Sequence, residues 1–173
     1  MSTAPAIGFS HRHLLGIDGL SPPEITHILE THRNEDYVTG ATDLAALTGA
    51  KIYRGAARGD AYGEGASEGD VYHLGAASLQ VLETPGHTDD SLSFALVDRR
   101  AGPDPVAVFT GDALFVGDVG RTDFYPDRAE AVAGLLHDSL HRKLLPLGDG
   151  VIIHPAHTSG SVCGASLSDR TFS

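Results

Sequence analysis

Four residues that can bind a metal ion each follow a short apolar segment and a tight turn in this sequence. They are His32, His87, Asp112 and His157. Strands are rigid enough to hold such side chains within the tolerance that a metal centre needs. Two neutral imidazoles and one carboxylate on one face of a metal leave other positions open, as in the facial triad of non-haem Fe(II) oxygenases. The same ligand types also hold catalytic zinc with a bound water.

Each of these residues also has an ordinary structural explanation. A single histidine at the end of a strand is more often exposed or hydrogen-bonded than metal-bound, and Asp112 after Gly111 fits a simple turn. The ordinary explanation loses force because several such positions follow one another along the chain. It is sufficient for five other histidines, which composition alone explains: His11, His13, His27, His137 and His141.

The elements that position these residues are predicted from apolar periodicity. Alternating β-branched residues favour a strand over residues 25–30, which ends in the polar loop that carries His32. A short helix around residues 44–47, capped by Thr42 or Asp43 and closed by Gly49, precedes a strand at 51–53. Residues 54–70 are rich in glycine, alanine and acid, and are predicted to form an exposed loop.

The second half of the chain shows a similar alternation. Strands are predicted at about 71–74, 78–83, 92–97, 105–109 and 151–153. Residues 126–145 carry apolar side chains at helical spacing, with Pro126 suited to the first turn. This order predicts an α/β (α+β) class in which helices cover sheets, as one domain over residues 1–173 with an irregular segment at 1–24.

Composition limits the kinds of partner and the cellular location that we expect for the chain. The formal net charge of −11 disfavours nucleic acid, and no apolar run approaches the roughly 20 residues of a membrane span. The single cysteine, Cys163, excludes a framework of internal disulfides. The first ten residues lack the basic and apolar regions of a signal peptide. A cytoplasmic location, with no nucleic acid or membrane partner, is therefore the expectation.

Several segments together resemble the metallo-β-lactamase superfamily, over roughly residues 25–164. They are Thr-His at 31–32 with the loop to Asp36, Thr-Pro-Gly-His-Thr at 84–88, Phe-Thr-Gly-Asp at 109–112 and Pro-Ala-His at 155–157. The stretches at 110–115, 120–124 and 160–164 resemble more narrowly its persulfide dioxygenase branch, which is related to glyoxalase II. The resemblance implies an αββα sandwich with a metal centre.

The chain departs from the family pattern in its first metal-binding loop. The usual His-x-His-x-Asp-His is here His32 to Tyr37, with Asn34 and Tyr37 in place of the second and third histidines. In family members with two zinc ions both metals use these histidines, and Asp36 with His157 alone makes a poor second site. The dioxygenase branch uses only the positions of His32, His87 and Asp112. The substitutions therefore favour one metal ion over two.

The resemblance implies a single Fe(II), with zinc as the alternative, and oxidation of glutathione persulfide to sulfite with O₂. Arg121 is a candidate for a glutathione carboxylate, because arginine forms bidentate pairs with carboxylates. A structural ion pair with Asp118 or Asp123 explains Arg121 equally well. Thr88 is a further candidate beside the substrate, and Asn34, Asp36, Tyr37 and His157 are expected around the metal or as remnants of a second site.

Two alternative functions stay open at this point. One is a zinc-dependent thioester hydrolase of the glyoxalase II type, and the other is a catalytically degraded member that acts as a binding subunit. Only 24 residues precede Ile25, where family members usually have two or three strands and a helix. The first sheet is therefore expected to be shortened, in a truncated chain or in a homodimer whose partner covers the exposed edge.

Overall fold

The computed structural model describes residues 25–33, 38–58 and 62–157. Two helices and eight strands make up the described part, with short π and 3₁₀ turns after the second helix. The helices are α1 (Ala41–Thr48) and α2 (Ala129–Ser139), and the strands are β1 (His27–Leu29), β2 (Lys51–Gly55), β3 (Glu64–Ala66), β4 (Val71–Leu74), β5 (Ala77–Glu83), β6 (Leu92–Asp98), β7 (Ala107–Gly111) and β8 (Ile152–Pro155).

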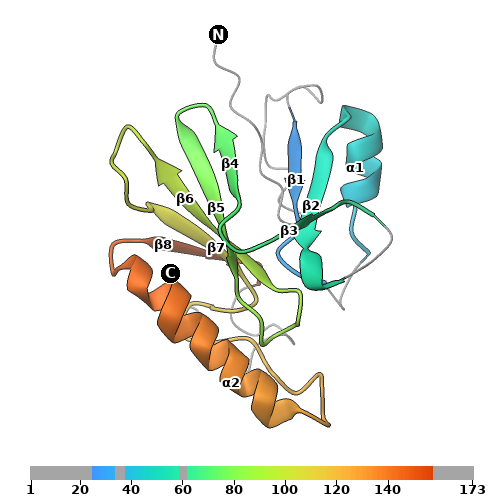
Figure 1. The fold of residues 1–173 in the computed structure, drawn as a ribbon, viewed down its shortest axis with the longest axis vertical. Coiled ribbons are helices and arrows are strands. Elements are labelled where there is room, and N and C mark those ends of the chain that lie inside the picture. Colours follow the sequence, from blue (N-terminus) through green and yellow to red (C-terminus); the bar gives the residue numbers. More distant parts are fainter. Residues whose placement is uncertain (1–24, 34–37, 59–61, 158–173) are drawn as a thin grey trace.

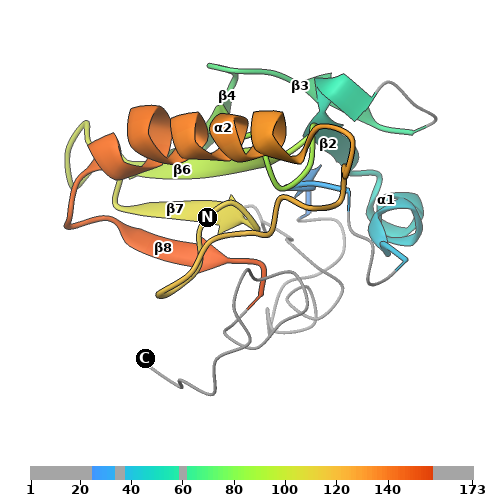
Figure 2. The same ribbon diagram turned by 90° about the horizontal axis from the view of Figure 1, so that it is seen from below.

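Within these residues the strands form two sheets with one helix on the outer face of each (Figures 1 and 2). The smaller sheet has the order β1-β2-β3 and is parallel throughout. The larger has the order β4-β5-β6-β7-β8, antiparallel except for the β7–β8 pair. Parallel neighbours need a crossover, which α1 supplies between β1 and β2. Gly49 ends α1 in the left-handed conformation, at φ 73°.

Three apolar clusters define the layers. Ile28, Ala41, Ala50 and Ile52 lie between α1 and the smaller sheet. Leu29, Ala66, Leu79, Val81, Leu92 and Phe94 fill the space between the two sheets. Leu82, Ala95, Val108, Leu136 and Leu144 join the larger sheet to α2 and the turns that follow it. Adjacent residues such as Ile28 and Leu29 enter different clusters because successive strand side chains point to opposite faces. The layers thus confirm the predicted αββα sandwich.

Most predicted elements are present with bounds shifted by a few residues, and two differences are larger. Strand β3 lies inside the segment 54–70, which was predicted to be an exposed loop; its three residues contain one buried side chain, Ala66, so they carry no periodic signal. Helix α2 begins at Ala129 rather than Pro126, because Arg128 N–H closes a turn on the carbonyl of Tyr125 at 3.0 Å. The expectation of a shortened first sheet concerned residues 1–24, which lie outside the described residues.

Among the described residues no helix combines the length and the apolar character needed to cross a membrane.

Candidate metal centre

Strand direction explains why three of the predicted residues meet. Strand β5 is antiparallel to β6, β6 is antiparallel to β7, and β7 is parallel to β8. Strands β5, β7 and β8 therefore run the same way, and their carboxyl ends lie at one edge of the larger sheet. His87, Asp112 and His157 follow these three strands, so the topology delivers them to that edge.

His32 follows a strand of the other sheet, and hydrogen bonds of its two neighbours tie it to the first residue of β6 and to Asp90 just before that strand. Leu92 N–H donates to the carbonyl of Thr31 at 2.6 Å. Arg33 N–H donates to Oδ2 of Asp90 at 2.9 Å, and Asp90 is itself buried. These bonds fix the residues on both sides of His32. The imidazole consequently has a defined position although no strand of the larger sheet carries it.

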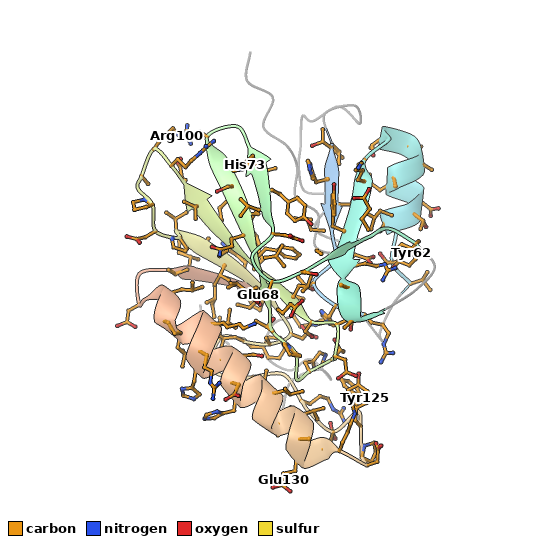
Figure 3. All side chains as sticks on the ribbon, in the orientation of Figure 1. Tyr62, Glu68, His73, Arg100, Tyr125 and Glu130 are labelled. Carbon is orange, nitrogen blue, oxygen red and sulfur yellow. The ribbon has the colours of Figure 1, made fainter. Side chains whose placement is uncertain are left out.

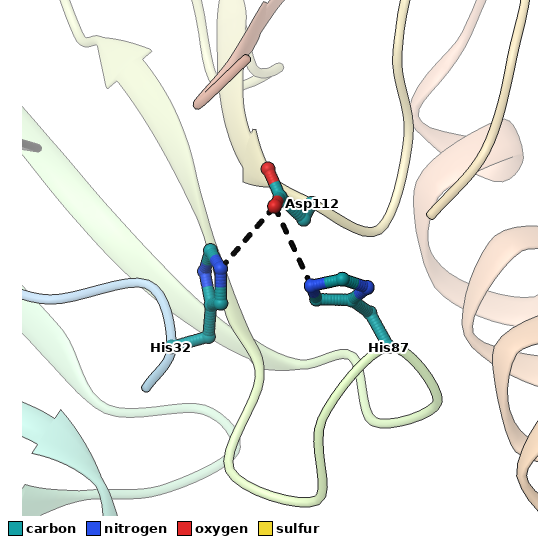
Figure 4. Close-up of side chains that lie close together, drawn as sticks. All are labelled: His32, His87 and Asp112. Carbon is teal, nitrogen blue, oxygen red and sulfur yellow. Dashed lines mark ion pairs between the residues drawn. The ribbon is translucent and has the colours of Figure 1, made fainter. Parts of the chain in front are cut away.

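The three residues expected to bind a metal converge in the structure (Figure 4). Nε2 of His32 and Nε2 of His87 each lie 3.4 Å from the same Asp112 oxygen, Oδ2. One ligand atom from each residue lies within 4.8 Å of the other two. The exposed fractions of the residues are 8%, 2% and 1% for His32, His87 and Asp112. Two nitrogens and one oxygen thus face a common point in a nearly dry environment.

The donor atoms fit a metal ion better than they fit one another. A separation of 3.4 Å is longer than a good N–H···O hydrogen bond. Nε2 of His32 is buried and has no hydrogen-bond partner among the described residues. Leaving a buried polar atom unsatisfied costs about 1–3 kcal/mol. A cation at the common point would satisfy this nitrogen and neutralise the Asp112 charge, so the residues present are compatible with one bound metal.

Neighbouring groups orient each of the three side chains. Nδ1 of His87 lies 3.0 Å from the carbonyl oxygen of Arg121, so this nitrogen carries the proton and Nε2 keeps its lone pair. Nδ1 of His32 lies 2.9 Å from the Thr31 hydroxyl. Nδ1 of His157 donates to both Asp112 oxygens, at 2.7 and 2.9 Å. Outer partners of this kind hold ligand rings in place and fix their tautomers.

The protonation states also suit metal binding. Burial lowers the pKa of His87 from its ordinary value, and the nearby His32 ring lowers it further, so the neutral imidazole is favoured. Burial alone would raise the pKa of the Asp112 carboxyl. Hydrogen bonding to His157 and the neighbouring His32 outweigh that effect and hold the pKa below its usual range, so Asp112 is ionised at neutral pH.

Two glycines make room for the centre. A Cβ atom at Gly120 would lie 1.9 Å from the carbonyl oxygen of Asp112. Gly111 has φ +54°, and a Cβ there would lie 2.8 Å from Cβ of Thr31. The backbone around Asp112 therefore packs directly against the segments that contain Thr31 and Gly120, and no side chain would fit between them.

The other predicted site residues have mixed positions. Arg121 pairs with Asp123, with Nη2 2.7 Å from Oδ2, and its guanidinium also lies over the Phe124 ring, which packs edge-on against His87. The structural ion pair foreseen for Arg121 is therefore present, at the border of the centre. Thr88 is buried and its hydroxyl lies 2.8 Å from that of Ser91. Three further candidates, Asn34, Asp36 and Tyr37, lie outside the described residues.

Sequence reasoning gave no role to three residues that shape this centre: Thr31, Asp90 and Phe124. An acidic residue in a turn is usually exposed, so nothing in the sequence distinguishes Asp90 from Asp89, which pairs with Arg128 at the surface. The signal for Asp90 is its burial, which requires the fold.

Two packed sheets, flanking helices and a histidine–aspartate group at the strand ends define a class of metal-binding α/β sandwich. The family model of the metallo-beta-lactamase superfamily matches residues 2–157 of this chain. The chain therefore belongs to the metallo-β-lactamase superfamily.

The relatives of this chain fall into two groups. Mouse mitochondrial persulfide dioxygenase ETHE1 is 30% identical over 164 residues, which cover 88% of this chain and 56% of the relative. The hydroxyacylglutathione hydrolase of Rhodospirillum rubrum is 35% identical over 138 residues, covering 77% of this chain and 48% of the relative. The chain spans about half the length of the curated relatives it matches.

Solved structures agree with the fold. ETHE1 from Myxococcus xanthus superimposes with a TM-score of 0.71 at 31% identity, over 93% of this chain and 68% of that one. A metallo-beta-lactamase from Staphylococcus aureus gives a TM-score of 0.71 at 32% identity, over 83% and 46%. The chain is thus related both to persulfide dioxygenases and to hydroxyacylglutathione hydrolases, and membership of the family does not choose between these two activities.

Proposed function

We propose that the chain is a mononuclear non-haem iron protein of the persulfide dioxygenase kind, which oxidises glutathione persulfide to sulfite. The observation that carries the proposal is the buried His32, His87 and Asp112 group, with its three ligand atoms within 4.8 Å of one another. Two imidazoles and one carboxylate form the ligand set of non-haem Fe(II) oxygenases, which leaves positions open for two reactants.

A bound Fe(II) would bring the persulfide sulfur and O₂ together and exchange electrons with them. The residues of the chain have separate tasks. His32, His87 and Asp112 hold the reacting centre, and the hydrogen bonds to Thr31, Arg121 and His157 keep them oriented. All three residues are buried, so their ligand atoms are shielded from bulk water.

Arg121 is the proposed contact to the substrate, whereas the buried Thr88, whose hydroxyl lies against Ser91, is assigned to supporting the turn that carries His87. The Arg121 guanidinium lies over Phe124, whose ring packs against His87, so a positive charge sits one ring away from the centre. Glutathione derivatives carry carboxylates, and arginine pairs with carboxylates through two parallel hydrogen bonds. The partner carboxylate in the structure, Asp123, would be exchanged for that of the substrate.

His157 favours one metal ion over two. Its Nδ1 already donates to both Asp112 oxygens, which uses this histidine to orient a ligand. With Asn34 and Tyr37 replacing two histidines of the family loop, a second zinc would lack the three protein ligands that stable zinc sites require.

A zinc-dependent thioester hydrolase is the second candidate, favoured by the relatives that are hydroxyacylglutathione hydrolases. Two histidines and an aspartate also hold catalytic zinc. A binding subunit without catalysis is the third, because Asn34 and Tyr37 replace two histidines of the family's metal-binding loop. The three candidates predict different outcomes in one experiment.

The test is O₂ uptake by anaerobically Fe(II)-loaded protein given glutathione persulfide, followed by assay of sulfite. His73 is an exposed residue of β4 (Figure 3), so its replacement is a suitable control. Wild type and His73→Ala should both consume O₂ and form sulfite. His87→Ala should do neither. Iron retention without O₂ uptake would refute the dioxygenase and direct the work to thioester cleavage by the zinc-loaded protein. Failure to retain any metal would favour the binding subunit.

A further inference from the structure

A second pair of histidines lies on the surface of the C-terminal helical segment. His137 is in the last turn of α2, and His141 is in the π-helical turn that follows, Leu140–Leu144. Their ring centroids are 4.3 Å apart, with an angle of 33° between the ring planes. Both residues are exposed, and the His137 side chain retains 68% of its accessible surface.

Helical geometry and anchoring explain why the two rings meet. Residues four apart on a helix lie one above the other on the same face. The opposite face is fixed to the larger sheet through Leu136 and Leu144, and Ser139 Oγ donates to the carbonyl of Pro85 at 2.8 Å. The segment is therefore a firm support that turns the pair of imidazoles toward solvent.

We propose that His137 and His141 form a bidentate site for a divalent transition-metal ion, in the order of preference Cu(II) over Ni(II) or Zn(II). Two histidines at i and i+4 on one helix face are the spacing with which helical zinc sites take two ligands from consecutive turns. Metal–imidazole bonds of about 2.0–2.1 Å place two ligand nitrogens on one ion roughly 3 Å apart. Rings with centroids 4.3 Å apart reach this separation through small side-chain rotations.

Asp138 supports one of the two ligands. Its Oδ1 lies 3.6 Å from Nδ1 of His137 and 3.4 Å from Nε of Arg142. A carboxylate on the Nδ1 side favours the tautomer that carries a proton there, which leaves the Nε2 lone pair for a metal. Arg142 keeps the carboxylate engaged, so we assign Asp138 to positioning, and water completes the coordination.

This site differs from the buried centre in the elements that carry it, in its exposure to solvent and in its ligand atoms. It is built on one helical segment from two nitrogens, whereas the buried centre joins both sheets and includes a carboxylate. The ligand set without oxygen and the open surroundings favour the metals at the top of the affinity series, with copper first. The chain should therefore bind copper even when the buried centre is filled with iron or zinc.

The test follows the ring protons of the two histidines by NMR during a titration of the zinc-loaded full chain with Cu(II). Paramagnetic broadening should affect both rings together, at the same low copper concentration. In His141→Ala the broadening of His137 should require at least about tenfold more copper, because a chelate loses its second, intramolecular contact. The reciprocal shift is expected for His141 in His137→Ala.

A matched control and an opposing outcome complete the design. His73→Ala removes one exposed histidine from β4 and should leave the copper dependence of both rings unchanged. If His137 broadens at the same copper concentration with and without His141, the rings bind copper singly and the proposal is wrong. Loss of dioxygenase activity would have no bearing on this result, since the readout is local to α2 and its π-helical turn.

Discussion

The buried centre and the exposed histidine pair use the same side chain in opposite environments. His32 and His87 come from segments 55 positions apart in the sequence, by subtraction of their numbers, and meet only because two sheets pack together. His137 and His141 meet because they are one helical turn apart. The first arrangement depends on the whole fold, and the second depends on one anchored helix. Changes that loosen tertiary packing should therefore affect the two sites very differently.

The largest contrast is expected from Asp112→Asn. The substitution removes the only negative charge of the three-residue group and one of the two oxygens that accept from His157. Retention of Fe(II) or zinc at the buried centre should fall by 100-fold or more, on the order of the free energy lost when a charge-assisted contact is deleted. Metal content after dialysis against a graded chelator measures it.

The control for Asp112→Asn is Asp98→Asn, at the end of β6, where the carboxylate pairs with Arg100 at the surface. That variant should retain metal like wild type, and Asp112→Asn should keep wild-type copper binding at His137 and His141. Unchanged metal retention in Asp112→Asn would contradict the assignment of the buried centre.

A pair of glycine substitutions tests the packing difference directly. Gly120→Ala places a methyl group 1.9 Å from the carbonyl oxygen of Asp112, so the backbone must shift. Overpacking of this kind costs about 1–3 kcal/mol in the free energy of unfolding. Gly134→Ala, on α2 three residues before His137, meets nothing within 4 Å and should stabilise by about 0.5–1 kcal/mol. Urea denaturation of both variants measures the change in the free energy of unfolding, which should fall in the first and rise in the second. Equal changes in the two variants would refute the steric argument.

The same contrast explains how far the sequence could predict the structure. His87 and Asp112 were found because each follows a strongly apolar strand and a glycine-containing turn, both of which are local signals. Helix α2 followed from periodicity for the same reason, whereas the αββα layer order came from the resemblance to the family. The short strand β3 and the buried Asp90 were missed, because a three-residue edge strand has no period and burial of a loop carboxylate is decided by a distant backbone N–H.

The histidine pair shows a second limit of prediction from sequence, in which a visible pattern was not assigned a function. The spacing of His137 and His141 is visible in the sequence, yet both were assigned to composition because neither follows an apolar strand and a tight turn. Their ring contact and the anchoring of the opposite face through Leu136 required the structure.

Substitution of a carboxylate beside each site should have effects of intermediate size. Asp90 accepts the N–H of Arg33, next to His32, and is buried. Asp90→Ala leaves that donor unsatisfied and should cost about 1–3 kcal/mol in stability, with roughly tenfold weaker metal binding at the buried centre. Asp90→Asn keeps an acceptor oxygen and should restore most of the binding, which a purely electrostatic role would not allow.

At the exposed pair the equivalent change is Asp138→Asn, where the carboxylate is only half-buried. Stability should change by less than about 0.5 kcal/mol, as for surface positions in general. Thermal or urea unfolding together with chelator competition measures all three variants. A large loss of stability in Asp138→Asn would show that the helix depends on its surface ion pairs more than the packing indicates.

The smallest expected effect is a pH dependence of stability that the buried centre contributes in the metal-free protein. The pKa of His87 is lowered in the folded state, chiefly by burial, from an ordinary value of 6.5. The folded chain then binds fewer protons than the unfolded chain between these two pKa values, so the free energy of unfolding rises with pH across that window. The contribution is complete above pH 6.5 and is lost as the pH falls through the lowered pKa. His87→Gln should flatten the profile between pH 7.5 and 5.5, measured by urea denaturation with chelator present, whereas an unchanged slope would place the pH dependence on other groups.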